Sequence, residues 1–308
     1  MQAATRPSVP ECRWQPRRLL PACWPCGYAP AMADPFHDDD LVHLATHGVP
    51  PLSAAAVSGY IDNEGARIWY AGLGSGPPVV LLHGGLGNSG NWGYQVPALV
   101  GAGYTAILID SRGQGRSTRE SRPYSYGLMA SDTRAVMDVL GVAKAAFIGW
   151  SDGADTALVL SRETPGRSMG VFFFACNVDR TGTKPFRSSP VIERIYNHHV
   201  REYAALSPLA GGFEAMRDDL AVMQASQPNY GPDELRNIVV PVWSVLGEHD
   251  EFIEREHAEY IARTVPGGKF VLLHSVSHFA PLQRPDVFNR AMLDFLREVQ
   301  SKSSGSLR

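Results

Sequence analysis

A serine between two glycines is the feature of this sequence that most directly indicates chemistry. Residues 149–153 read Gly-Trp-Ser-Asp-Gly, with an apolar segment at 145–150 and a segment of helical character at 154–162. In that context Gly-x-Ser-x-Gly forms a nucleophile elbow, a tight strand-to-helix turn that exposes the serine hydroxyl. The glycines let neighbouring backbone approach closely. The alternative is an ordinary turn in which Ser151 caps a helix.

A serine hydroxyl is a weak nucleophile at neutral pH, so it needs a base, an acid that orients the base, and donors for a developing oxyanion. A glycine-rich stretch, His-Gly-Gly-Leu-Gly at 83–87, follows the apolar segment 78–82 and is suited to presenting backbone N–H groups. It lacks the Lys-Ser/Thr and the Gly-x-Gly-x-x-Gly spacing of nucleotide-binding loops. The pattern therefore favours an oxyanion loop over a phosphate loop.

The strand, the glycine-rich loop and the elbow together resemble the α/β-hydrolase family. Residues 110–117, Asp-Ser-Arg-Gly-Gln-Gly-Arg-Ser, are similar to a further loop of that family. The resemblance implies a catalytic triad of Ser151, Asp250 and His278, in the chain order typical of the family. It also implies an oxyanion hole formed by the backbone N–H groups of Gly85 and Asp152. Asp179, just past another apolar segment, remains an alternative for the acid.

The same resemblance implies an α/β fold with a mainly parallel eight-stranded sheet flanked by helices. A helical cap is expected after the sixth strand, at residues 177–238, because roughly sixty residues are too many for an ordinary connection. The hydrolase core would comprise residues 50–176 and 239–301. Residues 1–40 are rich in Pro, Arg and Cys without helical or strand periodicity, which predicts a disordered, dispensable tail.

Local patterns agree with alternating strands and helices. Apolar segments at 57–61 and 66–71 flank a turn-rich stretch and predict a hairpin. Residues 190–206 and 213–226 predict cap helices. We expect aromatic and sulfur-containing cap side chains either to line a pocket above Ser151 or, as is more usual for a stripe at helical spacing, to pack in the core; these are Tyr196, Tyr203, Phe213 and Met223. His198 and His199 either line that pocket or face water, whereas His83 is expected to be structural.

Composition limits the class of protein. The 308 residues are 44% apolar and 19% charged, enough for a substantial core, and the net charge is −3. That charge gives no electrostatic reason to expect nucleic acid or an anionic membrane as a partner. The apolar runs are too short to span a bilayer. We expect a cytoplasmic protein with a small-molecule substrate and neither metal nor cofactor; the sequence leaves the oligomeric state open.

The resulting expectation is a serine hydrolase that cleaves a small carboxylic ester through an acyl-enzyme. The pentapeptide at 149–153 is also similar to the valacyclovirase-like branch of the family. Trp150, Asp152 and Phe279 are candidate substrate-binding residues. A negative Asp152 side chain would oppose an oxyanion, so it should point away, pair with an arginine or contact a cationic substrate group. Carbon–carbon bond hydrolysis, cofactor-free perhydrolysis and a non-catalytic receptor remain alternatives.

Overall fold

The computed structural model describes residues 39–209 and 211–305. The predicted disordered tail therefore falls mostly outside the described residues. It is wrong for its last two positions, because Asp39 and Asp40 begin helix α1 (Asp39–His47). Leu41 and Leu44 of α1 are buried in the core of the molecule, which explains why this segment is ordered.

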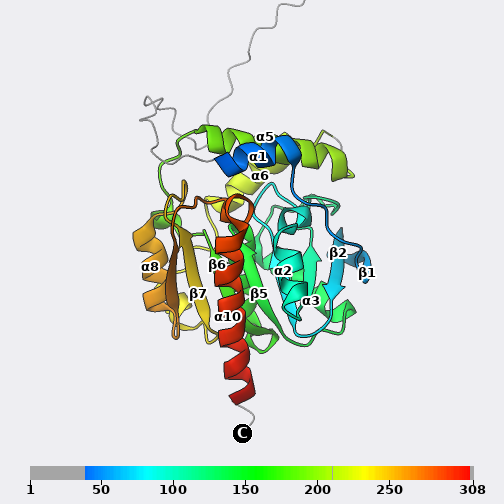
Figure 1. Ribbon diagram of the computed structural model, residues 1–308. Coiled ribbons are helices and arrows are strands. Elements are labelled where there is room, and N and C mark those ends of the chain that lie inside the picture. Colours follow the sequence, from blue (N-terminus) through cyan, green and yellow to red (C-terminus); the bar gives the residue numbers. More distant parts are fainter. Residues whose placement is uncertain (1–38, 210, 306–308) are drawn as a thin grey trace, which may run out of the picture. The chain divides into compact units, whose positions relative to one another are not determined.

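The centre of the fold is an eight-stranded sheet with the order β1-β2-β4-β3-β5-β6-β7-β8 (Figure 1). β1 and β2 pair antiparallel, β2 also runs antiparallel to β4, and the remaining pairings are parallel. The mainly parallel sheet and the hairpin are thus confirmed. The strands are β1 (Val57–Asn63), β2 (Ala66–Gly74), β3 (Pro78–Leu82), β4 (Thr105–Ile109), β5 (Ala145–Trp150), β6 (Ser168–Phe174), β7 (Val242–Gly247) and β8 (Lys269–Leu273).

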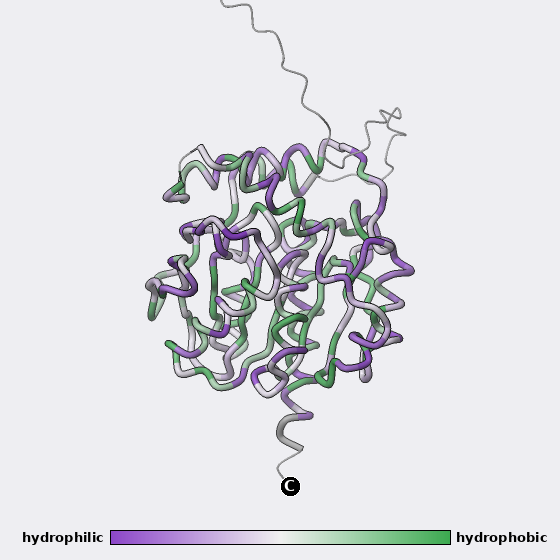
Figure 2. The backbone as a smooth tube through the Cα atoms, turned by 180° about the vertical axis from the view of Figure 1, so that it is seen from behind, coloured by the Kyte–Doolittle hydropathy of each residue, from purple (hydrophilic) through white to green (hydrophobic). Residues whose placement is uncertain are grey.

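Helices cover both faces of the sheet because the central strands are apolar on both sides. Alternate residues of β3 belong to different cores. Val79 and Leu81 share one core with helices α2 (Gln95–Gly101) and α10 (Pro285–Gly305). Val80 and Leu82 share the other core with α3 (Tyr126–Val139), α4 (Asp152–Glu163) and α8 (Arg255–Thr264). Figure 2 shows hydrophobic segments gathered along the central strands. Two short helices, α7 (Pro232–Arg236) and α9 (Ala280–Gln283), complete the core connections.

The predicted cap helices are present between β6 and β7. They are α5 (Pro190–Leu206) and α6 (Phe213–Gln224), and Figure 1 shows them across one edge of the sheet. Helix α1 packs against α5 and α9, and Asp40 forms an ion pair with Arg284 just after α9. Among the described residues, no helix is both long and apolar enough to cross a membrane.

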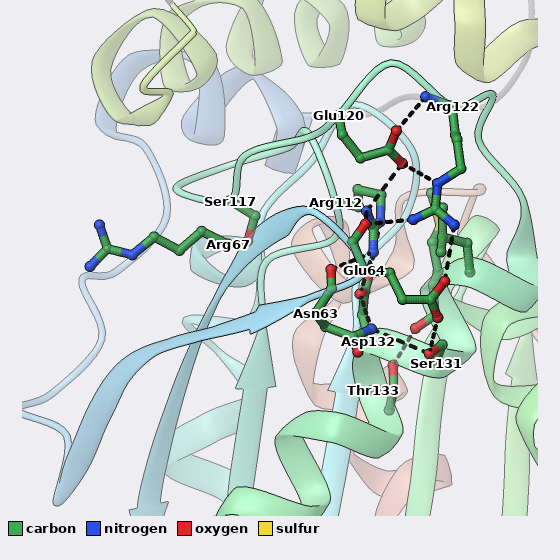
Figure 3. Close-up of polar contacts among 12 residues, drawn as sticks. Asn63, Glu64, Arg67, Arg112, Ser117, Glu120, Arg122, Ser131, Asp132 and Thr133 are labelled. Carbon is green, nitrogen blue, oxygen red and sulfur yellow. Dashed lines mark hydrogen bonds and ion pairs between the residues drawn. The ribbon is translucent and has the colours of Figure 1, made fainter.

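A buried arginine fixes the loop after β4 (Figure 3). Arg112 is 1% exposed and donates two hydrogen bonds to Asp132 of α3, at 2.6 and 3.0 Å, and others to the backbone oxygens of Asn63 and Glu64. A bidentate pair of this kind is geometrically specific. It ties the β1–β2 turn, the loop at 110–117 and α3 into one unit.

That loop in turn supports the glycine-rich loop. The Ser111 N–H donates to His83 Nε2 at 2.9 Å, and the Ser89 N–H donates to Asp110 Oδ1 at 2.8 Å. His83 is buried, and burial lowers its pKa, so the ring is a neutral acceptor here. The expectation that His83 is structural is confirmed by these contacts.

Candidate active site

Ser151 occupies the strained turn that the sequence predicts. It lies between β5 and α4 with φ 52° and ψ −124°, a left-handed conformation that is uncommon for a residue with a side chain. Its side chain makes no capping hydrogen bond to α4. The helix-cap alternative is therefore wrong, and the hydroxyl is left available at the helix N-terminus.

Two glycines make this turn sterically feasible. A Cβ on Gly149 would lie 2.4 Å from Ala154 Cα, and one on Gly153 would lie 2.0 Å from the Leu82 carbonyl oxygen. These are backbone atoms of helix α4 and strand β3, which cannot move aside at low cost. The motif needs glycine on both sides of the serine because β3, β5 and α4 converge there.

His278 follows β8 and faces the carboxylate of Asp250 from the loop after β7. His278 Nδ1 lies 2.9 Å from Asp250 Oδ2. The other oxygen, Oδ1, accepts hydrogen bonds from the N–H groups of Phe252 and Ile253, both at 2.8 Å. Burial alone would lower the pKa of His278, but the charge of Asp250 and the hydrogen bond to it outweigh burial, so the pKa is raised.

Other acidic residues near the predicted triad have different partners. Asp179 accepts from the Thr181 N–H at 2.7 Å as a helix cap, and Glu248 accepts from the Ser275 N–H at 3.0 Å. Glu251 accepts from the His278 backbone N–H at 3.0 Å. Burial and the neighbouring Asp250 charge raise the pKa of Glu251 to about 7. Sequence reasoning missed this contact, since an adjacent carboxyl has no motif of its own.

The backbone N–H groups of Gly85 and Asp152 remain available for a ligand. Gly85 lines the same cavity as Ser151, and Asp152 is the first residue of α4. Among the described residues, neither N–H donates a hydrogen bond. Two unused donors next to a partly exposed serine, one of them at a helix N-terminus, are suited to binding negative charge.

The Asp152 side chain does not line the cavity that contains Ser151. It is 4% exposed and accepts hydrogen bonds from Tyr126 Oη at 2.9 Å and from Gln224 Nε2 at 3.0 and 3.1 Å. Of the alternatives for this side chain, the pairing with an arginine is wrong, because neutral donors from α3 and α6 hold the carboxylate; contact with a cationic substrate group stays a prediction. Burial raises the pKa of Asp152 because these hydrogen bonds offset desolvation only in part.

One small cavity, about 40 Å³ in volume, brings the predicted residues together. Its lining comprises Gly84, Gly85, Asn91, Trp150, Ser151, His199, His278 and Phe279. Trp150 and Phe279, two of the candidate substrate-binding residues, are therefore present. Asn91 was not assigned to the site, whereas His199, expected either to line the pocket or to face water, lines the cavity. Because ligand pockets usually exceed about 300 Å³, substrate binding requires movement or a small substrate.

The cap aromatics pack into the core that α3 and α4 form on one face of the sheet. Tyr196 and Tyr203 pack edge-to-face on Phe213 with ring centroids 5.6 and 5.4 Å apart, and Met223 is buried. None of them lines the cavity around Ser151. For these four side chains, the predicted pocket-lining role is wrong and the predicted core role is right. Among the described residues there is also no cluster of three potential metal ligands.

Comparisons with known proteins agree with the fold. The model of the alpha/beta hydrolase fold family matches residues 77–170. The serine hydrolase BPHL of Homo sapiens is 26% identical over 83% of this chain and 92% of its own length. A 2-hydroxy-6-oxo-6-phenylhexa-2,4-dienoate hydrolase of Burkholderia cepacia is 26% identical over 75% of this chain and 91% of its own length.

A solved structure extends the agreement to three dimensions. The enol-lactonase from Burkholderia xenovorans LB400 superposes with a TM-score of 0.65 at 21% identity, covering 78% of this chain and all of its own. The sheet order, the elbow and these similarities lead to one conclusion. The chain has the α/β-hydrolase fold and is similar to hydrolases that include the serine hydrolase BPHL and the dienoate hydrolase.

Proposed function

We propose that the protein is a serine hydrolase that cleaves a small carboxylic ester through an acyl-enzyme on Ser151. The observation that carries this proposal is the geometry around one cavity. Ser151 stands there in a strained turn, and His278 faces the same cavity with Nδ1 2.9 Å from Asp250. That arrangement suits nucleophilic catalysis by a serine and an oriented imidazole.

The chemistry follows from the contacts. With Nδ1–H donated to Asp250, the Nε2 of His278 is free to accept the Ser151 proton as the hydroxyl attacks the ester carbonyl. The N–H groups of Gly85 and Asp152 would stabilise the oxyanion, and His278 would return the proton to the leaving alcohol. Water, activated by the same imidazole, would then hydrolyse the acyl-enzyme.

Carbon–carbon bond hydrolysis is the second candidate, because a relative's name describes a dienoate hydrolase. A dienoate carries a carboxylate. In this chain the cavity residues His278 and His199 are backed by the acidic side chains of Asp250 and Glu202. Their negative potential disfavours an anionic substrate and supports a neutral ester instead.

The test is steady-state hydrolysis of p-nitrophenyl esters from acetate to octanoate by wild type and Ser151→Ala. We expect turnover by the wild type and a loss on the order of 10⁴-fold or more in the variant. Short acyl chains should be preferred because the cavity is small.

A folded wild type without ester turnover would move the assignment to carbon–carbon hydrolysis, assayed with a dienoate substrate. Perhydrolysis would appear as peracid formation from acetate and peroxide. Thermal stabilisation by a ligand without any turnover would identify a receptor.

A further inference from the structure

A second imidazole reaches the cavity from the cap. His199, on α5, is 6% exposed and lines the cavity that contains Ser151 and His278. Of the described cap residues, His199 is the one that lines this cavity. A buried polar ring at that position is in place to contact whatever occupies the cavity.

The cap carboxylate Glu202 holds this histidine next to the glycine-rich loop. Glu202 Oε2 accepts hydrogen bonds from Asn88 Nδ2 at 2.8 Å and Asn91 Nδ2 at 3.0 Å. Its Oε1 lies 3.2 Å from His198 Nε2, and its Oε2 lies 3.8 Å from His199 Nδ1. One carboxylate thereby connects helix α5 to the loop that carries Gly85.

The nearby charge of Glu202 favours one of the two neutral tautomers of His199. Burial lowers the pKa of His199, so the ring is neutral at neutral pH. At 3.8 Å, His199 Nδ1 lies too far from Glu202 Oε2 for a hydrogen bond and has no hydrogen-bond partner among the described residues, but the negative charge of the carboxylate favours the tautomer with its hydrogen on Nδ1. Nε2 is then the unprotonated, accepting nitrogen of a ring that lines the cavity.

We propose that His199 is a substrate-binding residue whose Nε2 accepts a hydrogen bond from a hydroxyl group close to the scissile carbonyl. The substrate class is then a neutral hydroxy ester, simplest as an ester of a 2-hydroxy acid. Glu202 is the positioning residue: its bonds to Asn88 and Asn91 hold α5 beside the cavity, and its charge favours Nδ1–H on the ring of His199. This inference rests on the proposed ester hydrolysis and adds a specificity that the triad does not supply.

The experiment compares p-nitrophenyl 2-hydroxypropanoate with p-nitrophenyl propanoate, which differ by one hydroxyl. The readout is the ratio of their kcat/KM values. Wild type should prefer the hydroxy ester, and His199→Phe, which keeps an aromatic ring, should lower that ratio about tenfold or more. The rate of each protein on the propanoate ester is the reference for its own ratio, so a general loss of activity in the variant cancels.

Tyr196→Phe is the matched control. It removes a polar group from the same helix, but the Tyr196 hydroxyl accepts from Arg217 outside the cavity. The ratio should not change in this variant. A second pair, 2-hydroxyethyl acetate and propyl acetate, places the hydroxyl on the alcohol side and tests which half of the ester His199 contacts.

Nitrogen NMR of wild-type side chains adds a readout that needs neither turnover nor a folded variant. Two-bond correlations should identify a histidine ring protonated on Nδ1, with Nε2 unprotonated, that faces Glu202. A ratio unaffected by His199→Phe while esters are still hydrolysed, or an Nε2–H tautomer, would overturn the proposal. If the wild type hydrolyses no ester at all, both the proposed function and the role of His199 are overturned.

Discussion

Only one carboxylate oxygen of Asp250 is available to His278. Its Oδ1 accepts from two backbone N–H groups, which leaves Oδ2 for the imidazole. In Asp250→Asn the amide oxygen must keep the backbone bonds, so the amide NH₂ would face Nδ1 and select the wrong tautomer. We expect kcat to fall by about 10⁴-fold with the fold retained. Circular dichroism and ester kinetics are the measurements.

Asp179→Asn is the control for that variant, because Asp179 caps a short helix and has no contact with His278. Its activity should stay near the wild-type level. Equal losses in the two variants would contradict the assignment of Asp250 as the residue that orients the base.

The pH profile should reveal Glu251. The base must be neutral to act, so kcat/KM should rise with pH through the raised pKa of His278. Glu251, with a pKa of about 7, adds negative charge beside the imidazole as it ionises. Removing that charge in Glu251→Gln should move the rising limb to lower pH, measured as kcat/KM between pH 5 and 9.

Glu248→Gln is the matched comparison, since Glu248 is two residues before Asp250 and bonds Ser275 instead. It should leave the limb in place. A limb that does not move in Glu251→Gln, or that moves equally in both variants, would show that Glu251 has no electrostatic influence on the base.

At the scale of elements, the elbow depends on the convergence of β3, β5 and α4. Gly153→Ala places a Cβ 2.0 Å from the Leu82 carbonyl oxygen, so the strand and the helix must separate. We expect a loss of at least about 1–3 kcal/mol in the free energy of unfolding, with reduced kcat. Gly166→Ala is the control, because a Cβ there meets nothing within 4 Å. Equal stability of the two variants by urea unfolding would contradict the steric argument.

The sequence predicts individual helices and strands but not the contacts between distant elements. The strand and helix periods predict α5 with the bounds observed, and they predict the antiparallel hairpin of β1 and β2. The contacts of Glu202 with Asn88 and Asn91 join residues more than a hundred positions apart. Such pairings depend on how the cap packs, which no local pattern encodes. Tyr203 and Phe213 looked equally suited to a pocket and a core for the same reason.

The residue after the nucleophile illustrates this limit. An aspartate at position 152 predicts a negative charge beside the oxyanion. Its hydrogen-bond donors, Tyr126 and Gln224, come from distant helices and are known only from the tertiary structure. The main-chain role follows from the motif, whereas the side-chain environment follows from two helices that the motif does not include.

For the whole molecule, Asp152 makes stability depend on pH. Its pKa is raised by burial above the unfolded value, so its contribution is fully present below the unfolded pKa and is lost as pH rises through the folded pKa. Asp152→Asn cannot ionise and should therefore melt at a higher temperature than wild type at pH 8. The difference should shrink toward pH 4. Thermal melts followed by circular dichroism measure it.

The control is Asp138→Asn, a change at an exposed carboxylate that pairs with Arg167. It should alter the melting temperature little at either pH. A wild type that gains stability relative to Asp152→Asn as the pH rises would mean that the buried charge is compensated, contrary to the contacts described.

The central claim is that Ser151 is a nucleophile activated within this cavity. The most direct measurement is the intact mass of the protein after reaction with a p-nitrophenyl alkylphosphonate, followed by peptide mapping. We predict one phosphonyl adduct per chain, located on Ser151, with no adduct in Ser151→Ala and slow labelling in His278→Ala. An unlabelled wild type, or an adduct on another residue that persists in Ser151→Ala, would contradict the account.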